Sequence, residues 1–255
     1  MSEKKSHTEI IFGIHAMQAA LKTSAHRIRE LSVFQGRRDT KIKKIIEAAH
    51  GHNITVNYVD KNQLDALCDG NHQGVVAEIE AGRSLQESDL YELIADATHA
   101  PLILVLDGVT DPHNLGACLR SSDAAGVDAL VIPKDKSVGM NDTVRKVACG
   151  AAETVPLIPV TNLARCLKKM QDAGMWVTGL AGEAESSLYH TDLGGPRVIV
   201  MGAEGSGMRR LTRETCDSLV NIPMQGQVSS LNVSVATGIV LFETLRQRKL
   251  SESDG

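Results

Sequence analysis

The feature that most constrains this chain of 255 residues is an alternation that begins near residue 101. Short apolar runs typical of buried strands are separated there by longer stretches with helical spacing. Strands that are linked through helices lie parallel, because each helix carries the chain back across a face of the sheet. The pattern therefore predicts an α/β domain with a mainly parallel sheet covered on both faces. Strands are expected at 102–107, 129–133, 175–181, 197–202 and 219–223, and helices at 115–125, 142–151, 161–173 and about 231–248.

The first 80 residues predict a smaller α/β module with a core of its own. Residues 8–22 show helical spacing in part, and the lysines of 39–50 lie opposite its isoleucines, as in an amphipathic helix. Alternating apolar and polar residues predict strands at 30–34, 54–59 and 74–80.

A polar stretch separates the two parts of the chain. Residues 81–89, AGRSLQESD, carry few apolar side chains, and Asp89 is placed to cap a helix at 90–97. We therefore expect a first domain at 1–80, a linker at 81–98 and a second domain at 99–250.

Composition excludes several classes of protein. With 42% apolar and 23% charged residues, the chain is typical of a globular protein. Its longest apolar runs, such as LILVL, are far short of the roughly 20 residues of a membrane span. The first ten residues lack the apolar region of a secretory signal, so we expect a cytoplasmic protein without membrane association. The five cysteines are odd in number and form no CxxC pair, which favours small buried residues over disulfides or zinc ligands.

The net charge of −4 is unevenly distributed along the chain. Residues 1–80 hold 11 Lys and Arg against 10 Asp and Glu, with six of the nine histidines, whereas residues 81–255 hold 16 against 21. The first part is therefore the better candidate for a surface that binds a polyanion.

The loop after the expected strand at 102–107 contains the first group of candidate residues. Ligands bind outside the carboxyl ends of strands in open α/β sheets. Here Asp111 and Pro112 form a turn, Asn114 is placed to cap the next helix, and Arg120 follows inside it. Taken alone, the same residues also fit a capped helix with a solvated arginine.

The loop after the strand at 197–202 is rich in glycine. Its sequence, GAEGSGMRR, is typical of loops that hold a phosphate or an adenosine, with Glu204 as a hydrogen-bond acceptor. It is not the GxGxxG dinucleotide motif, has no GK[ST] of a P-loop and does not place Ser206 in a nucleophile elbow. An ordinary surface role for Glu204 is the alternative.

The third loop follows the strand at 219–223. Ser229, Ser230 and Asn232 precede a helix whose first backbone N–H groups could bind an anion, although plain N-capping explains them equally well. His113 has no second His or Cys at metal-ligand spacing, and we expect no metal. The three loops follow strands of one sheet, so we expect their tips to meet at one edge.

Three segments resemble the ordered motifs of the SPOUT-class, TrmH-type RNA 2′-O-ribose methyltransferases. They are NLGACLR at 114–120, VMGAEGSGM at 200–208 and IPMQGQVSSLNVSVATGIVLFE at 222–243. The stretch from 107 to 137 is similar to enzymes of this family that methylate guanosine in 23S rRNA. FGIHAMQAAL at 12–21 and HQGVVAEI at 72–79 resemble the family's ribosomal-protein-like substrate-binding domain.

The resemblance implies properties that composition and spacing do not. It implies S-adenosylmethionine as cofactor, a trefoil knot in the second domain, and a homodimer whose active sites each draw on both subunits. It implies 23S rRNA or a large-subunit precursor as partner, with a tRNA target or a non-catalytic assembly protein as alternatives. By motif position, cofactor contacts fall on Gly202, Ile222 and Leu231, and catalytic or substrate-orienting roles fall on Asn114, Arg120, Glu204, Ser230 and Asn232.

The chemistry of such a reaction fits these residue types. Transfer of a methyl group to a ribose hydroxyl is an in-line displacement, so alignment supplies much of the rate. The hydroxyl must lose a proton, and the resemblance makes Arg120 the candidate base. Because a guanidinium rarely deprotonates in proteins, Arg120 could instead bind the substrate phosphate and stabilise alkoxide charge. Glu204 and Asn114 would then orient it.

Overall fold

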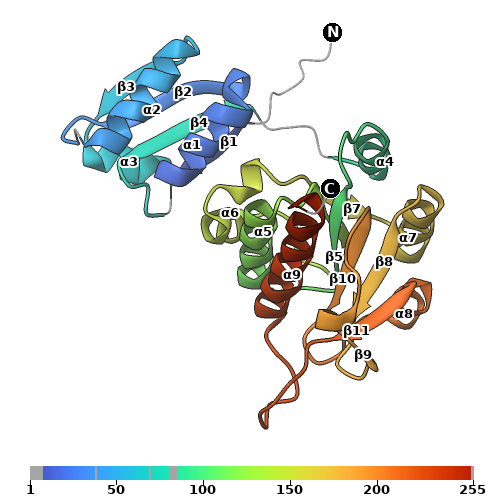
Figure 1. Ribbon diagram of the computed structural model, residues 1–255. Helices are drawn as coiled ribbons and strands as arrows, with labels where there is room; N and C mark the ends of the chain where they lie inside the picture. The colour runs from blue at the N-terminus through green and yellow to red at the C-terminus, as the bar shows by residue number, and fades with distance from the viewer. Residues whose placement is uncertain (1–7, 38, 69, 81–84, 254–255) are drawn as a thin grey trace. The chain divides into compact units, whose positions relative to one another are not determined.

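The computed structural model describes residues 8–37, 39–68, 70–80 and 85–253. The chain forms two compact units (Figure 1). The described residues up to Glu80 form the first unit together with 149–154, and the second unit contains 85–148 and the chain from 155 onward. Residues 81–84 of the expected linker lie outside the described residues.

The first unit is built on a four-stranded sheet with the order β1-β4-β2-β3. β4 pairs antiparallel with β1 and β2, and β3 lies parallel to β2. The unit contains β1 (Thr8–Phe12), α1 (Ile14–Thr23), β2 (Ile28–Phe34), α2 (Thr40–Gly51), β3 (Thr55–Val59), α3 (Lys61–Leu67) and β4 (Val75–Glu80).

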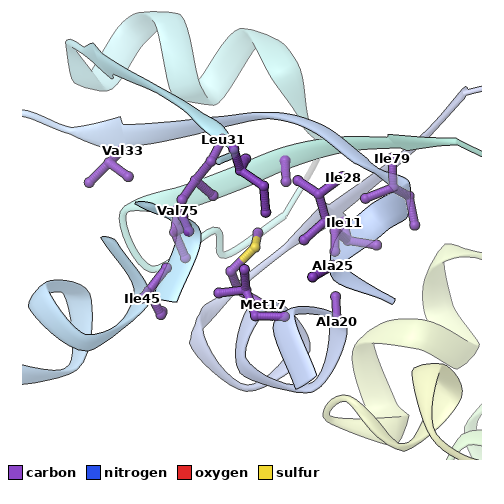
Figure 2. Close-up of a cluster of buried hydrophobic side chains, with 14 of the residues drawn as sticks. Ile11, Met17, Ala20, Ala25, Ile28, Leu31, Val33, Ile45, Val75 and Ile79 are labelled. Carbon is purple, nitrogen blue, oxygen red and sulfur yellow. The ribbon is translucent and has the colours of Figure 1, made fainter. Parts of the chain in front are cut away.

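The core of the first unit lies between this sheet and helices α1 and α2. Figure 2 shows Met17 of α1 reaching toward Leu31 of β2, with Ile45 of α2 beside Val75 of β4. All four side chains are buried and belong to one apolar cluster. This confirms a module with a hydrophobic core of its own within the first 80 residues.

One expectation for the first unit was wrong in part. Residues 8–22 are not one helical segment, because Thr8–Phe12 is a strand and the helix begins only at Ile14. Gly13 separates them with a φ of +92°, a conformation that L side chains rarely adopt. The apolar residues of the strand and of the helix happen to continue one helical spacing, so the two elements resembled a single helix in sequence. The short helix α3, which buries only Leu64, was not expected at all.

The second unit contains a seven-stranded sheet in which every recorded strand pair is parallel, as predicted. The strand order is β7-β6-β5-β10-β8-β11-β9, so β10 lies between β5 and β8 although it follows both in sequence. The strands are β5 (Leu102–Asp107), β6 (Ala129–Pro133), β7 (Leu157–Val160), β8 (Trp176–Leu180), β9 (Ser186–Ser187), β10 (Arg197–Gly202) and β11 (Ser218–Asn221).

Helices cover both faces of the parallel sheet, as the apolar strands predicted. Ile103 and Val105 share a buried cluster with Leu90 of α4 and Leu167 of α7. Figure 1 shows α5, α6 and α9 on the other side of the sheet, with α9 beside α5. The helices are α4 (Glu87–Ala95), α5 (Pro112–Ala125), α6 (Asp142–Ala148), α7 (Leu163–Asp172), α8 (Arg210–Thr215) and α9 (Val233–Ser253).

Two helix boundaries differ from the sequence expectation. The helix expected at 90–97 begins at Glu87, and Gln86 rather than Asp89 is its N-cap residue. Asp89 instead accepts a hydrogen bond from the backbone N–H of Gln86 at 2.7 Å. Leu90 is fully buried, so α4 belongs to the second unit rather than to a linker. The helix expected at 142–151 ends at Ala148, where Gly150 with a φ of +98° turns the chain.

Candidate active site

The three candidate loops leave the same edge of the parallel sheet, as expected. In the ladder between β10 and β5, Gly202 pairs with Asp107, the last residue of its strand. On the other side of β10, β8 and β11 also end at this edge. The loops that follow β5, β10 and β11 therefore begin close together.

Asn114 lies in the first turn of α5 and does not cap it. The N-cap residue is Asp111, whose carboxylate accepts a hydrogen bond from the backbone N–H of His113 at 2.9 Å. Pro112 occupies the first helical position, where its fixed φ and missing N–H suit a helix start. The expected cap at Asn114 was therefore wrong by three residues, and the Asn114 side chain is available for a bond to another loop.

Glu204 lies in a tight hairpin after β10. Ala203 and Gly207 exchange backbone hydrogen bonds of 3.1 and 2.9 Å across its base. Gly205 and Gly207 both have positive φ, which explains the glycines of this loop. The hairpin presents the Glu204 carboxylate to the start of α9, where it accepts hydrogen bonds from Asn232 Nδ2 at 2.5 Å and the Val233 N–H at 3.1 Å.

Asn232 joins all three loops. Its Nδ2 donates to Glu204 and, at 2.9 Å, to Oδ1 of Asn114. Its Oδ1 accepts from the backbone N–H and the hydroxyl of Ser234 at 2.9 and 2.6 Å. The capping interpretation of this segment is confirmed, because Asn232 accepts hydrogen bonds from Ser234 at the start of α9. Anion binding at this helix start stays a prediction. We call Asn114, Glu204 and Asn232 the amide–carboxylate cluster.

A cavity of about 460 Å³ lies beside the amide–carboxylate cluster. Of the predicted residues, Gly202, Glu204, Ile222, Ser230 and Leu231 line it. Among the described residues the lining does not include Asn114, Arg120 or Asn232. Arg120 lies exposed on α5. One chain thus brings together most of the predicted site but leaves Arg120 outside the cavity.

The loop after β8 is a part of the site that sequence reasoning missed. Leu180, Ala181, Gly182 and Glu183 line the cavity, and Glu183 forms an ion pair with Arg213 of α8, which also lines it. The sequence could have indicated this loop in the same way as the others, because a short segment of small and polar residues follows a buried strand. It contains neither a run of glycines nor a capping pattern that would have drawn attention.

Backbone segments pack closely around the cavity. A Cβ on Gly202 would lie 2.2 Å from the carbonyl carbon of Gly207 and 2.3 Å from the backbone N of Met208. A Cβ on Gly179 of β8 would lie 2.8 Å from Cys216 Sγ. Only glycine fits at Gly202, so the hairpin can fold directly over the strand end and form one wall of the cavity.

Cys216, whose Sγ lies next to Gly179 of β8, is a packing residue. Burial, together with the nearby carboxylates of Asp217 and Asp107, raises the pKa of its thiol to about 12. The thiol is therefore neutral at physiological pH and cannot serve as a nucleophile.

Within the described ranges, no group of three or more His, Cys, Asp or Glu residues is arranged to hold a metal ion. Over the same ranges, no helix combines the length and apolar character needed to cross a membrane.

Family models match both units of the chain. Residues 101–242 match the SpoU rRNA Methylase family, and residues 10–85 match the domain described as RNA 2′-O ribose methyltransferase substrate binding. The second match ends close to the boundary between the units, and the first covers the amide–carboxylate cluster and every residue that lines the cavity.

Two relatives are similar over almost the whole chain. The 23S rRNA (guanosine-2′-O-)-methyltransferase RlmB of Pseudomonas aeruginosa is 56% identical over 243 residues, which cover 95% of this chain and 98% of that protein. The protein of the same name from Escherichia coli K12 is 54% identical over 242 residues, covering 94% and 99%.

Solved structures share the fold. A crystal structure of an RNA 2′-O ribose methyltransferase is 27% identical, with a TM-score of 0.77 over 95% of this chain and 89% of that chain. The SpoU methyltransferase AviRb from Streptomyces viridochromogenes, solved in complex with the cofactor AdoMet, has a TM-score of 0.76 at 21% identity and covers 96% and 91%.

Proposed function

The chain belongs to the SpoU rRNA Methylase family, and from this premise we propose that it methylates the 2′-hydroxyl of a guanosine in 23S rRNA with S-adenosylmethionine. The resemblance of its three loops to TrmH-type SPOUT enzymes is thereby confirmed. We propose that the substrate is 23S rRNA or a large-subunit precursor and that the enzyme acts in the cytoplasm.

The strongest support for this proposal comes from the amide–carboxylate cluster. The amide–carboxylate cluster ties together three loops that are far apart in sequence, directly beside a cavity at the carboxyl edge of the sheet. A protein that kept the fold only to bind RNA would have no need of this arrangement. The cluster therefore favours an enzyme over a non-catalytic assembly protein.

The cavity fits the cofactor. Its volume of about 460 Å³ falls within the roughly 300–1,000 Å³ typical of small-molecule sites. We propose that Gly202, Ile222 and Leu231 hold S-adenosylmethionine mainly through their backbone groups, which the close packing at Gly202 brings to the cavity wall. When bound, the cofactor supplies a methyl group activated by a positively charged sulfonium.

The amide–carboxylate cluster orients the site. Glu204 is held by two N–H donors and Asn232 by bonds to two loops, so neither side chain is free to rotate. We assign them, with Asn114 and Ser230, to binding and orientation of the ribose. Fixed groups of this kind align a hydroxyl for in-line attack without reorganisation during the reaction.

Arg120 acts on the ribose and its phosphate. As a base it would take the proton of the 2′-hydroxyl; as a guanidinium it would bind phosphate in a planar fork and stabilise developing alkoxide charge. Both roles need Arg120 near the cavity, whereas in one chain it does not line it. This supports an active site completed by the partner subunit.

We propose that the enzyme is a homodimer that associates through α9. Val240 and Leu241 are buried within the chain, whereas Val235 and Phe242 are each about half exposed and lie with Ile239 on one stripe of the helix. An apolar stripe of this kind favours cover by another chain. Light scattering should give twice the 27.4 kDa of one chain, and a mass of 27.4 kDa at micromolar concentration would contradict the dimer.

We propose that the second unit contains a trefoil knot. β10 is inserted between β5 and β8, and after β11 the chain returns across the sheet to pack α9 beside α5. A chain end that passes back through segments already in place is the feature that distinguishes a knot from the usual unknotted connections.

The first unit, expected at 1–80, is proposed as the RNA-binding domain. Its match to a substrate-binding family and its higher share of basic residues support this role. Contacts made mainly to phosphates should weaken as salt concentration rises.

The function is tested by methyl transfer to defined RNA. Purified protein with labelled S-adenosylmethionine and EDTA should label 23S rRNA from cells that lack the protein, and mapping should place the label on one guanosine ribose. Label on tRNA instead would contradict the rRNA target. Cofactor binding without transfer to any RNA would contradict the enzyme, and a requirement for magnesium with RNA of unchanged fold would contradict the metal-free reaction.

A further inference from the structure

Asp107, the last residue of β5, has a fully buried carboxylate. Its Oδ2 accepts a hydrogen bond from the backbone N–H of Arg209 at 2.9 Å. Its Oδ1 accepts from Nε of the same arginine at 2.6 Å and lies 2.5 Å from Nη2. Both oxygens of one buried carboxylate are therefore bound by one residue, through its main chain and its side chain together.

These contacts hold together the two ends of the hairpin that carries Glu204, just outside its Ala203–Gly207 pairing. The first leg of the hairpin leaves Gly202, which pairs in register with Asp107. The second leg ends at Arg209, which is bound to Asp107 and is also the N-cap residue of α8. Asp107 therefore contacts the residues on both sides of the hairpin 203–208: Gly202 before it and Arg209 after it.

The hairpin needs such an anchor. It contains Gly205 and Gly207 in positive-φ conformations, and glycine has more conformational freedom to lose than any other residue. Its exposed tip is held by the bonds of Glu204 to Asn232 and to the Val233 N–H. Without a fixed base, the Glu204 carboxylate would sample positions away from α9.

We propose that Asp107 and Arg209 are positioning residues for the methyltransferase site. Their ion pair fixes the base of the hairpin and so keeps Glu204 bonded to Asn232. Neither residue lines the cavity within the described part of the chain, and the role is exerted through Glu204 rather than on a reacting atom. The inference rests on the proposed function for its catalytic consequence, but not for its structural one.

The main test compares Asp107→Asn with wild type. Asparagine keeps the shape and one acceptor but loses the charge that binds the guanidinium. We expect kcat to fall by about 10²-fold, the size of effect that a displacement of about 1 Å produces in an aligned site. Arg209→Lys keeps the charge but loses the planar fork, so its kcat should lie between those of Asp107→Asn and wild type.

A matched control is available one residue further along. Arg210 is the same residue type on the same helix, and it pairs with Glu214 on the exposed surface. Arg210→Ala should leave kcat within about two-fold of wild type, because exposed pairs of this kind contribute little. A loss of kcat as large as that of Asp107→Asn would overturn the assignment, since the loss would then not be specific to the buried pair.

Non-additivity separates positioning from a general loss of stability. In a Glu204→Gln background, Asp107→Asn should lower kcat by less than about three-fold, because the group it positions is already changed. If kcat of the double variant were about 10²-fold below that of Glu204→Gln alone, Asp107 would not act through Glu204, and the proposal would be overturned.

Hydrogen exchange gives a readout that needs no activity. Peptides covering 203–208 should exchange at least ten-fold faster in Asp107→Asn than in wild type and in Arg210→Ala, while peptides from β5 are unchanged. Unchanged exchange at 203–208 would overturn the proposal even if kcat fell. If wild type binds S-adenosylmethionine but methylates no RNA, the proposed function fails, and the exchange result still decides the positioning role.

Discussion

The two edges of the parallel sheet use charged side chains in opposite ways. At the amino ends of the strands, Asp128 accepts the Leu102 N–H at 2.8 Å and Asp217 accepts the Val177 N–H at 2.7 Å. Arg248 donates to the carbonyl oxygens of Ala100, Pro101 and Gly195. Each of these charges is bound to backbone groups near the start of a strand or in the segment that leads into one.

At the carboxyl edge, the amide–carboxylate cluster adds contacts between side chains of different loops. Glu204, Asn232 and Asn114 bond one another across the start of α9, and Glu204 and Asn232 remain exposed. Binding and catalytic residues are concentrated on loops that a rigid scaffold positions. We therefore expect substitutions at the amino edge to lower stability. Substitutions at the carboxyl edge, where we propose that the reaction takes place, should lower activity.

The largest effect is expected at the carboxyl edge. Arg120→Ala should lower methyl transfer by about 10²–10³-fold at saturating RNA, because a fixed charge contact that strengthens in the transition state is lost. Cofactor affinity, measured by calorimetry, should change little, since the proposed cofactor contacts fall on Gly202, Ile222 and Leu231 rather than on Arg120. A substantially active Arg120→Ala enzyme would remove Arg120 from the catalytic set.

Arg120→Lys sharpens this result. Lysine keeps the charge but not the planar fork. Substantial activity would indicate a point charge near phosphate, whereas an almost inactive enzyme would indicate that the fork or a guanidine base is required. The comparison is made at saturating RNA so that weaker binding is not mistaken for slower chemistry.

The next effect is expected at the amino edge and has the opposite profile. Arg248→Ala leaves three backbone carbonyls without their charged donor, which should cost about 2–3 kcal/mol of unfolding free energy. For a unit of this size, the midpoint of thermal unfolding falls by roughly 2–4 °C per kcal/mol. At 20 °C, kcat should stay within about two-fold of wild type. If Arg248→Ala lowered kcat without lowering the midpoint of thermal unfolding, the proposed separation of stability at the amino edge from activity at the carboxyl edge would be wrong.

The smallest effect is a pH dependence on α9. Hydrogen bonds from Arg246 and Gln247 to the Glu243 carboxylate hold its pKa below the usual value. Because the folded pKa is the lower one, the stabilisation is present above the unfolded pKa of about 4.3 and is lost as pH falls through the folded pKa. Unfolding midpoints of Glu243→Gln and wild type should differ at pH 7 and converge below pH of about 4. Midpoints that diverge further at low pH would contradict this sign.

Sequence reasoning located the buried strands well, and the reason is physical. Continuous apolar runs at 102–107, 129–133 and 197–202 coincide with β5, β6 and β10, since central parallel strands are apolar on both faces. β7 was missed because Pro159 lies within it. Proline is tolerated there because β7 is an edge strand, which is a fact of the sheet order rather than of the segment.

For the site, the residue types were predicted but their bonds were not. Asn114 was expected to cap α5, and the structure assigns the cap to Asp111 and bonds Asn114 to Asn232. Local sequence identifies a residue able to accept a hydrogen bond, but its partner is chosen by a loop 118 residues away. The same limit hid the loop after β8, whose Glu183 acquires a role only beside Arg213.

The late position of α9 has a consequence for synthesis on the ribosome. Asn114 and Asn232 are separated by 118 residues, and at about 5–20 residues per second their pairing must wait roughly 6–24 s after Asn114 is made. β10 cannot occupy its place between β5 and β8 before that interval is well advanced. Non-local pairings of this kind also slow folding after release. A nascent chain therefore cannot form the bond between Asn114 and Asn232 until Asn232 has been made, so shorter nascent chains lack the amide–carboxylate cluster.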